Sequence, residues 1–80
     1  MDFIERRKSE DCGCPEEDWI LNGIYTTIHL EDDGSGHILL DFGDNGEEDK
    51  LVECDGSMKK LLSIANDWTQ EFLEQFIIKG

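Results

Sequence analysis

The 80-residue chain carries 20 acidic side chains against 7 lysines and arginines, which gives a formal net charge of -13 at pH 7. Nucleic acid repels a surface this acidic, so we expect no direct binding of DNA or RNA. The longest apolar runs are three residues, too short to cross a membrane, and the length suits one small domain.

The negative charge is concentrated in the middle of the chain. Fifteen of the 20 acids lie in the stretch from Glu10 to Asp55, where Lys50 is the only lysine or arginine. The segments on either side are close to neutral. Because concentrated charge of one sign attracts cationic partners, this distribution predicts a basic protein as the partner.

Residues 1–14 are expected to form a flexible N-terminal arm, because they are polar and show no sustained periodicity. The basic cluster Arg6–Lys8 would either fold back on the acidic segment or stay solvated. The arm has no apolar core of a secretory signal, and three cysteines are a poor basis for a disulfide framework. Both observations predict a cytoplasmic protein with free thiols.

Residues 15–80 are expected to form a single acidic α+β domain. Its first segment, residues 15–23, has two possible interpretations. Pro15 at a first helical position, followed by acids, is typical of a short helix that ends at Asn22-Gly23. Alternatively, Trp19 to Leu21 forms a strand, and Asn22-Gly23 is a two-residue hairpin turn. The sequence supports both interpretations equally.

Three strands are predicted next. Residues 24–31 alternate, with apolar side chains and Thr26 on one face. Residues 32–36 have turn composition, residues 37–42 form the second strand, and an acidic turn leads to the third at residues 51–54. Short connections favour an antiparallel meander.

A C-terminal helix is predicted from Ser57, its expected N-cap. Apolar residues recur every three or four positions and form a stripe of Met58, Leu61, Leu62, Ala65, Trp68, Phe72, Leu73 and Phe76. Such a stripe needs a sheet to cover it. We therefore expect an α+β fold, a small three- or four-stranded antiparallel β-meander with the C-terminal α-helix packed on one face.

Catalysis and metal binding are poorly supported by the sequence. The possible bases, His29 and His37, are expected on the outer face of the sheet, and no phosphate-binding glycine loop is present. We expect no enzyme activity, no cofactor and no metal. The weaker alternative is a small metal-binding module, in which Cys12, Cys14 and Cys54 hold zinc together with either histidine.

The outer face of the sheet combines apolar and acidic residues, which is typical of a protein-binding surface with an apolar centre and a charged rim. We predict a partner-binding site made of Tyr25, Glu31, Asp32, Asp33, Leu39, Asp41, Asp44, Glu47, Glu48, Asp49 and Glu53. Carboxylates at strand spacing lie at distances comparable to those of successive phosphates, so the surface is suited to imitate a nucleic acid.

The predicted function is therefore a non-enzymatic acidic inhibitor that occupies a basic, nucleic-acid-binding surface of a partner protein. Phage-encoded anti-restriction and anti-CRISPR inhibitors are similar in size and charge, although the chain carries no motif of any such family. An immunity or antitoxin protein that neutralises one cognate toxin is the alternative. We expect a monomer or a weak homodimer.

Overall fold

The computed structural model describes residues 1–10 and 12–79, with side chains described as far as Gln75. Within these residues a single antiparallel sheet has the strand order β1-β2-β3-β4-β5, so each strand pairs only with its neighbours in sequence. The elements are β1 (Asp2–Lys8), β2 (Pro15–Leu21), β3 (Ile24–Leu30), β4 (Ser35–Asp41), the 3-10 turn η1 (Gly43–Asn45), β5 (Glu47–Glu53) and α1 (Met58–Lys79).

The α+β class, the meander and the C-terminal helix agree with the sequence prediction, but the sheet has five strands where three or four were expected. The strand alternative for the segment after Pro15 is the correct one. The additional strand is β1, which lies in the segment predicted to be an arm. This strand is exposed along its whole length and pairs with β2, so its sequence shows no buried apolar face.

The hairpin between β2 and β3 is closed by Asn22 and Gly23, both in the left-handed region with φ of 52° and 81°. Two successive positive φ angles are the signature of a type I′ turn, whose twist matches that of the flanking strands. The Asn22 side chain also donates a hydrogen bond of 2.9 Å to Oγ1 of Thr69 on α1. This contact ties the turn to the helix.

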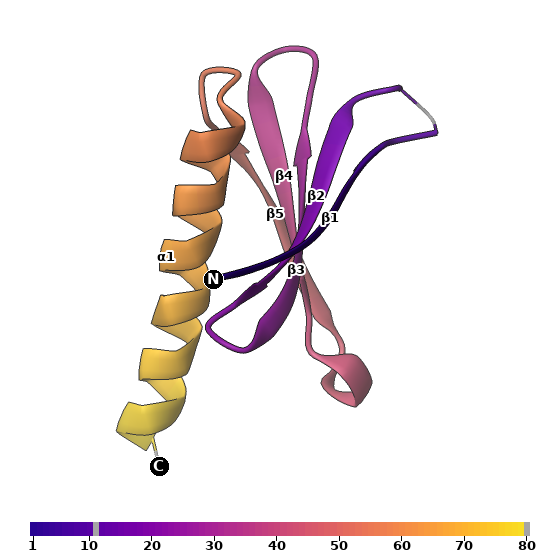
Figure 1. Ribbon diagram of the computed structural model, residues 1–80. Helices are drawn as coiled ribbons and strands as arrows, with labels where there is room; N and C mark the ends of the chain where they lie inside the picture. The colour runs from indigo at the N-terminus through magenta and orange to yellow at the C-terminus, as the bar shows by residue number, and fades with distance from the viewer. Residues whose placement is uncertain (11, 80) are drawn as a thin grey trace.

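The core lies between the sheet and α1, which runs along one face of the sheet (Figure 1). Its buried members are Leu21, Ile28, Ile38, Leu40, Cys54, Leu61 and Ala65. Trp68 and Phe72 of the predicted stripe pack against this cluster, whereas the side chain of Phe76 is outside the described residues. Among the described residues, no helix combines the length and apolar character needed to cross a membrane.

The helix begins at the predicted cap, because Oγ of Ser57 accepts a hydrogen bond of 3.1 Å from the backbone N–H of Lys60. We expect Ser57→Ala to lower the free energy of unfolding by about 1 kcal/mol, measured by urea denaturation, since one helical N–H loses its partner. Ser63→Ala, at an exposed position inside the helix, is the control and should be neutral or slightly stabilising. Equal losses in both variants would contradict the capping role.

Candidate functional site

One face of the sheet is left open, because α1 covers the other (Figure 1). On this open face the register places Tyr25 beside Asp41, and Leu39 beside Asp49. Tyr25 is 40% exposed and Leu51 is 67% exposed. Apolar and acidic side chains therefore lie side by side on the outer half of the face, on β3, β4 and β5. We call this half the acidic open face and define it as Tyr25, Leu39, Asp41, Glu47, Asp49, Leu51 and Glu53.

The structure separates the predicted partner-binding residues into four groups. Six of them lie on the acidic open face: Tyr25, Leu39, Asp41, Glu47, Asp49 and Glu53. Glu31, Asp32 and Asp33 lie in or beside the β3–β4 connection at one end of the sheet, and Asp44 lies in η1 at the other end. Glu48 pairs with Leu40 on the helix side of the sheet. The predicted set is thus not one continuous surface.

Lys50, the base within the acidic segment, also lies on the helix side of the sheet. Its ammonium group sits 4.4 Å from the ring centre of Trp68. Among the described residues, no Lys or Arg forms an ion pair with the four carboxylates of the acidic open face. The pairing that does occur there is between Asp49 and Nε2 of His37 at 3.2 Å. The negative field of this half is therefore directed outward.

A second group of acids is neutralised inside the fold. Glu16, Glu17 and Asp18 on β2 pair with Arg6 and Arg7 on β1. Of the two alternatives for the basic cluster, folding back on the acids is the observed one. The signal in the sequence was complementary charge on both sides of a short connection, but only the hairpin register could show which residues meet.

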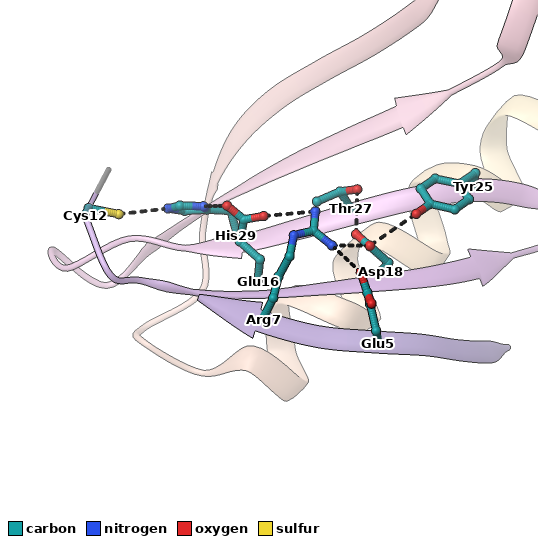
Figure 2. Close-up of polar contacts among 8 residues, drawn as sticks. All are labelled: Glu5, Arg7, Cys12, Glu16, Asp18, Tyr25, Thr27 and His29. Carbon is teal, nitrogen blue, oxygen red and sulfur yellow. Dashed lines mark hydrogen bonds and ion pairs between the residues drawn. The ribbon is translucent and has the colours of Figure 1, made fainter. Parts of the chain in front are cut away.

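Asp18 lies at the centre of this pairing although it is only 2% exposed (Figure 2). Its carboxylate pairs with Arg7 and accepts hydrogen bonds from Thr27 Oγ1 at 2.9 Å and from the Tyr25 hydroxyl at 3.1 Å. Burial opposes ionisation, but the hydrogen bonds from Arg7, Thr27 and Tyr25 outweigh it and lower the pKa of Asp18. Asp18 is therefore a buried carboxylate with its charge matched by three donors.

Glu17 is the equivalent residue on the helix side of β2. It is 3% exposed and accepts hydrogen bonds from Nε of Arg6 at 2.8 Å and from the indole N–H of Trp19 at 2.9 Å. Phe3 stacks edge-on against Trp19, with ring centres 5.2 Å apart. The two faces of β1 are thus anchored to β2 by different contacts.

A thiol–imidazole cluster forms at the end of the β1–β2 hairpin. The side-chain ligand atoms of Cys12, Cys14 and His29 all lie within 4.8 Å of one another. Sγ of Cys12 is 3.5 Å from Nε2 of His29, and Nδ1 of the same ring contacts Glu16 at 3.0 Å (Figure 2). Cys54 is not part of this group, since its buried thiol donates to the carbonyl of Gly34 at 3.4 Å.

The two thiols of this cluster differ in acidity. The hydrogen bond from the Cys14 thiol, followed by that from its backbone N–H, lowers the pKa of Cys12. The same thiol pair, together with burial and Asp32, raises the pKa of Cys14 to about 12. Burial favours the neutral ring of His29, yet its contacts with Glu16 and Cys12 raise its pKa. Cys12 is therefore the thiol that loses its proton first.

No family model matches the chain, and neither the curated proteins nor the solved structures give a match to it.

Proposed function

We propose that this protein is a non-enzymatic binding protein whose acidic open face occupies a basic, nucleic-acid-binding surface of a partner protein. The observation that carries the proposal is the uncovered face itself. It presents four carboxylates without a Lys or Arg partner among the described residues, around apolar side chains of which Tyr25 and Leu51 are strongly exposed.

The composition of this face fits a protein partner. A tyrosine and two leucines supply an apolar centre, which aromatic anchors commonly provide in protein interfaces. The surrounding carboxylates supply long-range attraction, which acts mainly on the association rate. Glu47 and Asp49, alternate residues of β5, lie about 6.8 Å apart, a spacing of the order found between phosphates. A surface that holds nucleic acid through Lys and Arg would therefore accept the acidic open face.

Two hollows at the ends of the sheet add to the acidic character of the surface. One, of about 560 Å³, is lined by Asp32, Asp33, Glu53 and Asp55, together with Gly34, Ser35 and Gly56. The other, of about 710 Å³, has Phe42 and Phe72 in its wall beside Asp41, Glu47 and Glu48. Cationic side chains of a partner would find carboxylates at both ends as well as on the face.

The test compares two variants of equal net charge. The first neutralises the open face by Asp41→Asn, Glu47→Gln, Asp49→Asn and Glu53→Gln. The control neutralises four exposed acids away from the open face and from both hollows by Glu10→Gln, Asp67→Asn, Glu71→Gln and Glu74→Gln. Each variant, immobilised in parallel with the wild type, is used to capture proteins from a lysate at low and high salt. Captured proteins are identified by mass spectrometry, and duplex DNA is added as competitor.

We expect the wild type and the control to retain a basic protein that high salt and DNA release. The open-face variant should bind it at least tenfold more slowly, because electrostatic attraction acts over long range. Equal retention by the open-face variant would contradict the proposal. A partner that neither salt nor DNA releases would instead support the immunity or antitoxin alternative.

A further inference from the structure

The thiol–imidazole cluster has the geometry of a metal site. We propose that Cys12 Sγ, Cys14 Sγ and His29 Nε2 bind one zinc ion, with water at the fourth position beside Glu31 and Asp32. This proposal is independent of the acidic open face. It also differs from the set expected from sequence, because Cys54 is not among the ligands and the histidine is His29 of β3.

One ligand–ligand distance already matches that of a zinc-bound pair. Zinc lies about 2.3 Å from a cysteine sulfur and about 2.05 Å from a histidine nitrogen, so tetrahedral geometry separates these two ligands by about 3.6 Å. Cys12 Sγ and His29 Nε2 are 3.5 Å apart. The group as a whole fits within 4.8 Å, so closure around an ion requires only small shifts of side chains.

The backbone explains why these residues meet. The register of β2 and β3 pairs Glu16 with His29, which brings the imidazole to the end of the β1–β2 hairpin. Ser9 closes the hairpin through its N–H to the carbonyl of Cys14 at 2.8 Å, and its own carbonyl accepts the N–H of Gly13 at 2.9 Å. Gly13 has a φ of 70°, which favours glycine and allows the turn that directs both cysteines toward β3.

The imidazole is oriented by a second layer of contacts. Nδ1 of His29 contacts Oε1 of Glu16 at 3.0 Å, and Oε2 of Glu16 pairs with Arg7 at 3.1 Å (Figure 2). With the proton on Nδ1, the lone pair of Nε2 faces Cys12, as in the carboxylate–histidine–zinc arrangement of known metal sites. Glu16 is thus a positioning residue for the metal ligand.

The surroundings favour a cation. Oε1 of Glu31 lies 3.4 Å from Nε2 of His29, and Oδ1 of Asp32 lies 3.4 Å from Sγ of Cys14. Two thiolates and one imidazole prefer zinc to calcium or magnesium, which bind oxygen ligands. A bound ion would also connect the β1–β2 hairpin to β3, a useful constraint in so small a domain.

The test uses the full chain in reduced form with Co²⁺ and Zn²⁺ as probes. Native mass spectrometry should show one zinc per chain, and Co²⁺ should give the thiolate charge-transfer and tetrahedral d–d absorption bands. Cys12→Ser and Cys14→Ser should lose the cobalt bands and at least tenfold in zinc affinity, measured by competition with a coloured chelator. Cys54→Ala and His37→Ala are the controls, and they should keep the cobalt absorption bands and the zinc affinity of the wild type.

Glu16→Gln tests the positioning role. We expect it to retain one zinc per chain but to weaken binding roughly 10- to 100-fold, as second-layer changes do elsewhere. Thermal unfolding of every metal-free variant checks that the fold is retained. Absence of zinc and cobalt binding by the reduced wild type would overturn the proposal, as would unchanged affinity in Cys12→Ser and Cys14→Ser. Equal affinity of Glu16→Gln and wild type would overturn the positioning role alone.

Discussion

We expect Asp18→Asn to be among the most damaging single substitutions, with a loss of about 2 to 3 kcal/mol in the free energy of unfolding. Asp18 is almost completely buried, and its carboxylate is matched by Arg7, Thr27 and Tyr25. The amide has nearly the same shape but carries no charge, and its N–H₂ group faces donors. The estimate is below the range for fully buried pairs because the Arg7 side chain is 42% exposed.

Urea and thermal denaturation measure this loss, which should lower the melting temperature by roughly 10 to 20 °C for a domain of this length. Asp49→Asn is the matched control, because Asp49 is exposed and its contact is with His37. The control should change stability by less than about 0.5 kcal/mol. A similar small effect from Asp18→Asn would show that the buried carboxylate is not stabilised by its three donors.

The contribution of Asp18 should also depend on pH in a defined direction. Its pKa is lowered in the folded protein relative to about 3.9 in the unfolded chain, so folding favours the ionised form. The stability that Asp18 supplies is therefore complete above about pH 5 and is lost as the pH falls through the lowered pKa. The difference in unfolding free energy between wild type and Asp18→Asn should accordingly be constant near neutral pH and shrink below about pH 4.

The second large effect is expected from Gly36→Ala, with a loss of about 2 to 3 kcal/mol. Gly36 is buried on β4 and faces α1, where an added Cβ would overlap the methyl groups of Leu61 and lie 3.0 Å from its Cγ. Leu61 is fully buried, so its side chain has no free space into which it can rotate. The helix or the strand must shift to accommodate the methyl group.

A double-mutant cycle tests whether Gly36→Ala acts through its overlap with Leu61 or destabilises β4 independently of Leu61. Leu61→Ala alone should cost about 3 kcal/mol through the cavity it leaves. The double variant Gly36→Ala/Leu61→Ala should lose at least about 1 kcal/mol less than the two single losses combined, because the new methyl occupies that cavity. Additive losses in urea denaturation would contradict the contact. His37→Ala, the next residue on the open face, is the control and should have little effect.

The sequence predicted the parts of the fold that show a regular apolar pattern. In β3 and β4 alternate residues face α1, and in the helix most described members of the apolar stripe pack on the core, so periodicity was sufficient there. Leu73, which the predicted stripe also included, is instead 37% exposed. In β2 the pattern is hidden because Glu17 and Asp18 are buried as charges. In β1 it is absent, and among the described residues the strand is held to β2 by backbone pairing, by ion pairs and by the contact of Phe3 with Trp19.

The candidate site was predictable only in its general character. The concentration of charge was evident, but which acids remain unpaired depends on the β1–β2 register, in which Arg6 meets Glu17. The thiol–imidazole cluster depends on two registers at once. Cys12 and His29 are 17 positions apart, and their proximity follows from the hairpin connection of β1 and β2 together with the pairing of Glu16 and His29. Residue spacing contains no direct signal for such a contact.

The order of the elements, with α1 after all five strands, affects how the protein folds during its synthesis on the ribosome. Strands β1 to β5 are synthesised first, and each can pair at once with the strand made just before it. The apolar face of the sheet stays exposed to solvent until the helix has left the exit tunnel. Folding intermediates with an exposed apolar face are prone to aggregate. Slow translation across residues 54–75 would therefore lengthen the period in which the nascent chain depends on chaperones.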